Sequence, residues 1–101
     1  MEGRGMRFRD KAVLVIGGNS GIGLSAAKGF AAEGARVVVT GRDPKTLAEA
    51  ALSIGNGALA LRSDISDIDS LDTVIATMRE RLGRIDVLFV NAGIGTFAPI
   101  P

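Results

Sequence analysis

The 101-residue chain contains no cysteine, no histidine, no tyrosine and no tryptophan. Without cysteine it has neither a disulfide framework nor a thiolate metal site, and a reducing, cytoplasmic location is expected. The absence of histidine removes the commonest metal ligand and the commonest general base. We therefore expect no metal site, and catalysis that depends on histidine is excluded.

An excess of charge of one sign and long apolar runs are also missing. Twelve basic residues stand against eleven acidic ones, which gives a net charge of +1. Nucleic acids and anionic membranes need a basic patch, and the basic residues near the N-terminus are typical of a solvated arm. No apolar run approaches the length of a membrane span, and no signal-peptide pattern is present. We expect no nucleic acid and no membrane as a partner.

Apolar runs and helical patterns alternate along the whole chain. The runs that predict strands are 12–16, 37–39, 58–61 and 85–90, and the helical patterns occupy about 22–34, 44–54 and 71–82. Residues 1–8 are expected to be a flexible lead-in. This order predicts an α/β fold in which a parallel sheet of four buried strands carries helices on its faces through right-handed crossovers.

Two of these segments make specific predictions about packing. The third helical pattern has its apolar residues on one side at helical spacing, which indicates packing against the core. These residues are Leu71, Val74, Ile75, Met78 and Leu82. The last strand is apolar at Val87, Leu88, Phe89 and Val90 and would lie at an edge of the sheet. A continuation of the chain, a partner chain or self-association is expected to cover it.

A glycine-rich turn follows the first predicted strand and opens the first predicted helix. Gly17, Gly21 and Gly23 have the spacing G-x-x-x-G-x-G. Glycine allows a tight reversal, a close approach of the backbone to a phosphate, and close packing of the helix on the sheet. Exposed N–H groups and the positive end of the helix dipole then attract an anion. The pattern favours a pyrophosphate site over a purely structural turn.

Two other phosphate-binding loops are excluded residue by residue. A P-loop, G-x-x-x-x-G-K-[ST], would require lysine where Leu24 stands. The spacing G-x-G-x-x-G, counted from Gly17, would require glycine where Asn19 stands. Nucleoside triphosphate chemistry is therefore not expected.

Four motifs together resemble the short-chain dehydrogenase/reductase family. They are IGGNSGIG at 16–23, VVVTGRD at 37–43, SDISD at 63–67 and DVLFVNAG at 86–93. Their order is that of the family and their spacing is close to it, and the resemblance extends from Phe8 to the last residue. It implies the N-terminal half of a Rossmann-type, doubly wound parallel sheet with about four strands and three helices. It also implies binding of NAD(H) or NADP(H).

The resemblance assigns cofactor-binding roles to individual residues. Gly17, Asn19, Ser20, Gly21, Ile22 and Gly23 would cradle the pyrophosphate and ribose, Asp64 and Ile65 the adenine, and Asn91, Ala92 and Gly93 would line the ribose side. The family usually has threonine where Ile16 stands, so one polar contact that steadies the loop is missing. Two roles stay open, because Asp64 could cap a helix and Asn91 could stabilise the backbone.

The end of the second predicted strand bears on which dinucleotide is bound. An NAD-preferring site usually has a carboxylate there, whereas this chain has Gly41 followed by Arg42. A guanidinium can pair with the 2′-phosphate of NADP and stack on adenine. Asp43 is the alternative ribose ligand, but its place before Pro44 favours a helix N-cap. NADP(H) is therefore favoured over NAD(H). The preference rests on Arg42 alone, because the glycine loop adds no second cation.

The catalytic residues of the family are absent from the chain. The resemblance implies hydride transfer between the nicotinamide C4 and a carbonyl or alcohol carbon, with a tyrosine, a lysine four residues later and a serine. No tyrosine is present, and the serines have no histidine to activate them. We assign no catalytic residue and expect the chain alone to be inactive. Only an intact protein is expected to bind an alcohol or ketone substrate. The alternative is a stand-alone nucleotide-binding module or a non-catalytic remnant.

Overall fold

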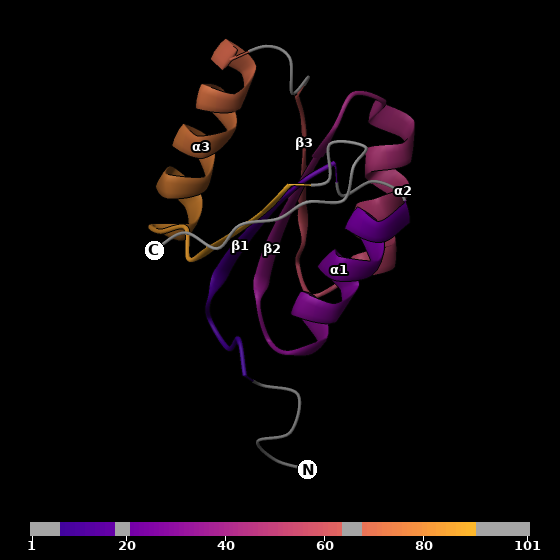
Figure 1. Cartoon of the computed structure of the whole chain (residues 1–101), viewed down its shortest axis with the longest axis vertical. Helices are drawn as coiled ribbons and strands as arrows, with labels where there is room; N and C mark the ends of the chain where they lie inside the picture. The colour runs from indigo at the N-terminus through magenta and orange to yellow at the C-terminus, as the bar shows by residue number, and fades with distance from the viewer. Residues whose placement is uncertain (1–6, 18–20, 64–67, 91–101) are drawn as a thin grey trace.

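A four-stranded parallel sheet with the order β3-β2-β1-β4 forms the centre of the molecule (Figure 1). The structure is a computed structural model and describes residues 7–17, 21–63 and 68–90. Its elements are β1 (Ala12–Ile16), α1 (Gly21–Ala32), β2 (Arg36–Gly41), α2 (Pro44–Ile54), β3 (Leu59–Arg62), α3 (Ile68–Leu82) and β4 (Val87–Val90). The predicted alternation of strands and helices is confirmed, with ends that shift by a few residues.

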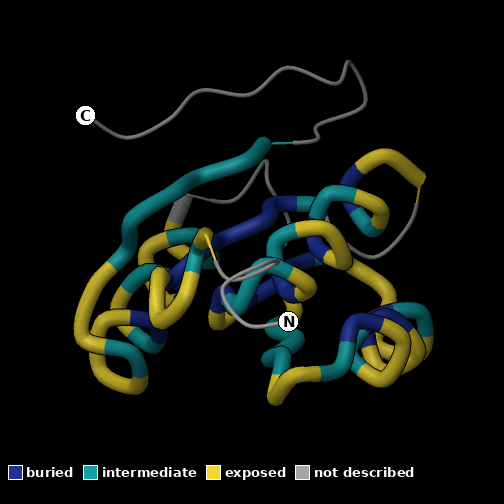
Figure 2. The backbone as a smooth tube through the Cα atoms, turned by 90° about the horizontal axis from the view of Figure 1, so that it is seen from below, coloured by how far each residue is buried: buried dark blue, intermediate teal, exposed yellow. Residues whose placement is uncertain are grey.

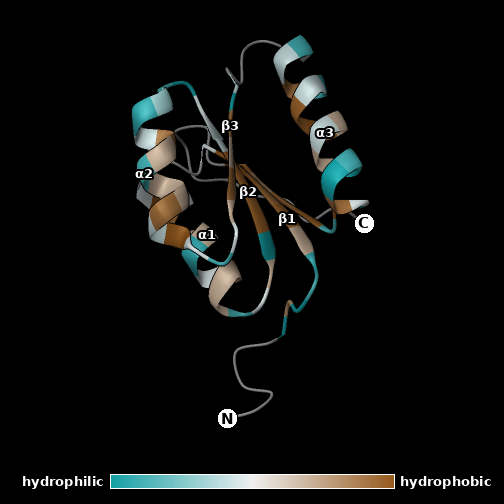
Figure 3. Ribbon diagram, turned by 180° about the vertical axis from the view of Figure 1, so that it is seen from behind, coloured by the Kyte–Doolittle hydropathy of each residue, from teal (hydrophilic) through white to brown (hydrophobic). Residues whose placement is uncertain are grey.

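The helices cover both faces of the sheet, as Figures 1 and 3 show from opposite sides. Val13 and Val15 of β1 belong to the core cluster under α1 and α2. Leu14 and Ile16 belong to the cluster under α3. Because successive side chains of a strand point to opposite faces, a strand covered on both sides is apolar at every position. The continuous run in β1 therefore fits a doubly wound α/β sheet, which confirms the predicted fold class.

The prediction of four buried strands is correct for the inner strands and wrong for β3, whereas β4 is the edge strand that the sequence analysis expected. All of β1 and most of β2 are buried, whereas β4 is half-buried along its length and β3 is half-buried or exposed (Figure 2). Each outer strand pairs with one neighbour in the described sheet. Strand position in the sheet decides this difference, and a run of apolar residues carries no information about it.

The third helix packs as its apolar stripe predicts. Val74 and Met78 are buried, with exposures of 2% and 0%. Leu71, Ile75 and Leu82 pack around them in the core cluster on the face of the sheet that α3 covers. The stripe thus supplies the core of one face of the sheet.

The described end of the predicted lead-in is anchored to α1. The backbone N–H of Phe8 donates to the carbonyl oxygen of Glu33 at 2.8 Å. The rings of Phe8 and Phe30 meet edge to face, with 5.1 Å between their centroids. Arg7 Nε lies 3.3 Å from Glu33 Oε1. Residues 7 and 8 therefore belong to the folded unit, unlike the flexible lead-in that was expected.

Asp86 joins the amino ends of β1 and β4. Its Oδ2 accepts a hydrogen bond from the backbone N–H of Ala12 at 2.8 Å, and its own N–H donates to the Ala12 carbonyl at 2.8 Å. Arg84 Nη2 lies 2.9 Å from Asp86 Oδ1. The Ala12 hydrogen bond, followed by that from Arg84, lowers the pKa of Asp86 from its ordinary value of 3.8.

Replacing Asp86 by asparagine is expected to flatten the acid dependence of stability. A carboxyl whose pKa is lowered by folding stabilises the protein above its unfolded pKa, and this contribution is lost as the pH falls through the lower folded pKa. The wild-type melting temperature should therefore fall more steeply below about pH 4 than that of Asp86→Asn. Thermal unfolding followed by circular dichroism measures this. Asp72→Asn, which removes an exposed carboxylate of α3, is the control. Equal slopes for wild type and Asp86→Asn would contradict the prediction.

Candidate functional site

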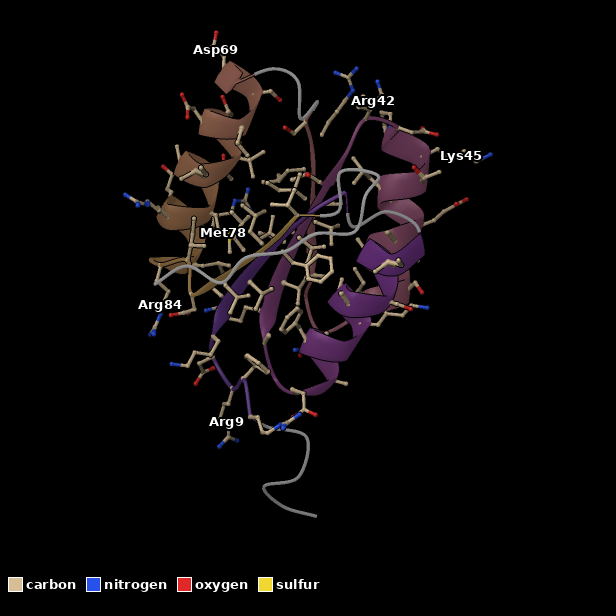
Figure 4. The ribbon with its side chains drawn as sticks, in the orientation of Figure 1. Arg9, Arg42, Lys45, Asp69, Met78 and Arg84 are labelled. Atoms are coloured by element: carbon tan, nitrogen blue, oxygen red, sulfur yellow. The ribbon has the colours of Figure 1, made fainter. Side chains whose placement is uncertain are left out.

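The candidate site lies at the carboxyl ends of the strands, where the direction of winding reverses. From β1 the chain adds β2 and then β3 on one flank of β1, and then crosses back to place β4 on the other flank of β1. In open α/β sheets a ligand binds in the crevice outside the strand ends at such a reversal. Gly17 follows β1 there, and Arg42 follows β2 at the same end (Figure 4). Arg9 and Arg84 lie toward the opposite end of the molecule.

The described glycines of the turn have the conformations that the sequence pattern requires. Gly17 has a φ of 81° and Gly21 a φ of 58°, both in the left-handed region that side chains disfavour. Gly21 is the first residue of α1, and Gly23 is buried within the first turn of that helix. Ile22 is 63% exposed, so a large apolar side chain lies at the surface beside the loop. Asn19 and Ser20 lie outside the described residues.

Thr40 holds the start of this turn, a role that the sequence analysis missed. The N–H of Gly17 donates to the Thr40 carbonyl at 3.0 Å and to Thr40 Oγ1 at 3.3 Å. Thr40 is 1% exposed, and it pairs in register with Ile16. The neighbouring strand therefore offers a hydroxyl to the loop, although the usual threonine of β1 is replaced by Ile16. The signal was a polar residue that directly follows the three valines of β2.

Thr40→Val and Thr40→Ser are expected to separate loop geometry from stability. Valine removes the hydroxyl but leaves Gly17 its carbonyl acceptor, so cofactor affinity should fall about three- to tenfold with an unchanged or higher melting temperature. Serine keeps the hydroxyl and loses a buried methyl group, so affinity should stay and the melting temperature should fall. Cofactor titration and thermal unfolding measure both properties. Wild-type affinity in Thr40→Val would contradict the role.

Asp43 caps α2, as its place before proline predicted. Its Oδ1 accepts from the backbone N–H of Lys45 at 3.0 Å, and its φ of −97° and ψ of 112° are extended. The side chain of Thr46 also donates to the Asp43 carbonyl, at 3.1 Å. The carboxylate therefore serves the helix. Arg42, which precedes it, is exposed at the end of β2.

Arg62 is a second residue that the sequence analysis missed. It is the last residue of β3 and pairs with Gly41 in the sheet. Its Nε donates to the carbonyl oxygen of Arg42 at 3.1 Å. The sequence places the two arginines twenty positions apart, and only the parallel pairing of β2 with β3 brings them together.

Ser63 ties the end of β3 to its neighbours. Its N–H donates to the Gly41 carbonyl at 2.8 Å, and Ser70 Oγ, on α3, donates to Ser63 Oγ at 3.0 Å. Asp64 and Ile65, predicted to hold adenine, lie outside the described residues, as do Asn91, Ala92 and Gly93. The structure thus places Gly17, Gly21, Ile22, Gly23 and Arg42 of the predicted site.

Among residues 7–17, 21–63 and 68–90, no three acidic, histidine or cysteine side chains are grouped so that they could hold a metal ion. Within the same ranges no helix has the length and apolar character needed to cross a membrane.

Comparison with known proteins decides the family. The sequence model described as short chain dehydrogenase matches residues 11–101. The chain belongs to the short chain dehydrogenase family. It is 40% identical over 95 residues to galactitol 2-dehydrogenase of Agrobacterium fabrum, a match that covers 94% of this chain and 37% of that protein. It is 41% identical over 99 residues to L-rhamnose 1-dehydrogenase (NAD(P)(+)) of Azotobacter vinelandii, which covers 91% and 39%.

Solved structures of short chain dehydrogenases have the same fold. A short chain dehydrogenase from Bacillus anthracis superimposes with a TM-score of 0.81 at 41% identity, over 84% of this chain and 35% of that one. The 3-ketoacyl-(acyl-carrier-protein) reductase of Brucella melitensis, solved in complex with NADH, gives 0.76 at 36% identity, over 80% and 34%. The chain spans well under half of the length of these relatives. It corresponds to the N-terminal, NAD(P)-binding portion of the family, which binds nicotinamide dinucleotides.

Proposed function

We propose that residues 1–101 form one partial dinucleotide-binding domain of an oxidoreductase that transfers hydride between a nicotinamide and a carbonyl or alcohol carbon. The observation that carries the proposal is the turn with left-handed Gly17 and Gly21, which follows β1 where the winding of the sheet reverses. The cofactor-binding residues of the proposal are Gly17, Asn19, Ser20, Gly21, Ile22, Gly23, Arg42, Asp64, Ile65, Asn91, Ala92 and Gly93. The exposed side chain of Ile22 supports it, because a bound cofactor would cover this apolar surface.

The preferred cofactor in this proposal is NADP(H). An NAD site needs a carboxylate at the end of β2 that is available for the ribose hydroxyls. Asp43 is the nearest carboxylate in sequence, and it bonds to the Lys45 N–H. Arg42 is exposed at the same position and has a charge suited to a 2′-phosphate.

Titration of the purified chain with NADPH and NADH, followed by the fluorescence of the reduced nicotinamide, tests this function. We expect saturable binding of both, tighter for NADPH, and no NAD(P)-linked turnover of alcohols or ketones by the chain alone. Absence of saturable binding would reject the dinucleotide site. Equal affinities would reject only the NADP preference. The intact mass of the native species in its source cell then distinguishes part of a larger oxidoreductase from a stand-alone nucleotide-binding module.

We also propose that the chain, when alone, self-associates along β4. A groove of about 630 Å³ lies beside β4, with Phe8, Phe30, Val87 and Phe89 among its lining residues. An edge strand next to an apolar groove favours association with another surface. Sedimentation velocity over a concentration series would detect it, and a monomer at all concentrations would contradict it.

We further propose that the protein is cytoplasmic, which the absence of cysteine supports. Cell fractionation tests this location.

A further inference from the structure

The ends of β2 and β3 bring two arginines together at the carboxyl edge of the sheet. Arg62 pairs in register with Gly41, the residue before Arg42. Side chains two apart on a strand share a face, and Ala60 packs with the cluster under α1 and α2. Arg62 therefore lies on the face where the turn at Arg42 leads into α2.

The hydrogen bond between the two residues leaves one edge of the Arg62 guanidinium available. Its Nε donates to the Arg42 carbonyl at 3.1 Å. A guanidinium is a planar fork of five donors, so a bond through Nε leaves the donors of the two Nη groups for other partners. Such an edge matches two oxygens of a phosphate. The same bond also satisfies the Arg42 carbonyl, whose partial negative charge would otherwise face an incoming anion.

The charges around this pair favour a dianion. Arg42 and Arg62 are both exposed, and Lys45 follows on the first turn of α2 (Figure 4). Among the described residues, the carboxylate next to Arg42 in sequence is that of Asp43, which accepts from the Lys45 N–H. A single exposed arginine binds a phosphate weakly because water screens it, whereas two guanidinium groups share its charge and its oxygens.

We propose that Arg62 is a specificity-determining residue that binds the 2′-phosphate of adenosine together with Arg42. The proposal rests on the proposed NADP preference and deepens it. In this proposal Arg42 and Arg62, at the ends of β2 and β3, together discriminate between the two dinucleotides. The glycine loop, which adds no cation at Asn19 and Ser20, then needs none.

Adenosine 2′,5′-bisphosphate and adenosine 5′-monophosphate are the probes, because they differ only in the 2′-phosphate. Isothermal titration of Arg62→Ala should show affinity for the bisphosphate reduced about five- to twentyfold, with that for the monophosphate changed less than about twofold. The control is Arg36→Ala, which removes the same charge from an exposed arginine at the other end of β2. It should leave both affinities at the wild-type values.

The outcomes separate this inference from the function on which it rests. A wild-type chain that binds both probes equally would overturn the NADP preference and the role of Arg62 together. A wild-type preference for the bisphosphate that persists in Arg62→Ala would overturn the role of Arg62 and leave that of Arg42. Equal losses for both probes, or the same loss in Arg36→Ala, would also overturn it, since the effect would then be structural or a matter of net charge.

Discussion

Replacing Gly23 by valine is expected to abolish measurable binding of both NADPH and NADH. Gly23 is buried in the first turn of α1, directly after the glycine turn. A branched side chain there would push the helix from the sheet and displace the N–H groups that would face a pyrophosphate in the proposed site. We expect a loss of at least about a hundredfold in affinity, or about 2.8 kcal/mol. Fluorescence titration with each reduced cofactor measures it.

The same helix offers a matched control for the Gly23 variant. Gly29 is exposed, and a Cβ added there would meet no atom within 4 Å. Gly29→Ala should therefore bind both cofactors as the wild type does and gain about 0.5–1 kcal/mol of stability. Gly23→Ala, with a smaller side chain, keeps the test interpretable if the valine variant unfolds, and it should show an intermediate loss. Wild-type affinity in a folded Gly23→Val would mean that the loop is only a turn.

Arg42→Ala is expected to weaken NADPH binding about ten- to a hundredfold while NADH binding changes less than about twofold. The 2′-phosphate of NADPH would lose the guanidinium with which it pairs at the end of β2. NADH has no such phosphate. The ratio of the two dissociation constants is the quantity to measure, because a general loss of structure lowers both affinities.

The conservative replacement sharpens the test of Arg42. Arg42→Lys keeps the positive charge but lacks the planar fork that bonds to two phosphate oxygens. It should recover the part of the NADPH affinity that comes from the charge, but not the part that comes from the two-point contact with the phosphate. If Arg42→Ala weakens NADPH and NADH equally, the 2′-phosphate role is lost and Arg42 acts on a part common to both cofactors.

Much of the fold could be predicted because its signals are local. The glycine spacing after an apolar run, proline after Asp43 and the apolar stripe centred on Val74 and Met78 each act within a few residues. The structure confirms the Asp43 cap and the packing of the stripe, and it gives Gly17 and Gly21 the left-handed conformations that suit a tight turn. Local steric and hydrogen-bonding preferences favour the glycine turn and the cap, and helical spacing alone places the stripe on one side of α3.

The contacts that the sequence analysis missed connect residues far apart in the chain. Thr40 reaches Gly17 across twenty-three positions, and Arg62 reaches Arg42 across twenty. Phe8 packs on Phe30 although its segment was expected to be flexible. Neither composition nor periodicity reports on strand register, and register alone determines which side chains of parallel strands become neighbours.

The sequence by itself determined the α/β class, the glycine turn that opens α1, the family and the absence of the tyrosine that the family uses in catalysis. These follow from residue types and their spacing along the chain. The tertiary structure decided the strand order β3-β2-β1-β4, and with it the reversal of winding at the turn, which is where open α/β sheets bind ligands. It also decided that β3 and β4 are half-buried, that Thr40 holds the turn, and that Arg42 has Arg62 beside it. The reason is that parallel strands joined by helices become neighbours only when the sheet forms, so their shared edge is a property of the folded sheet.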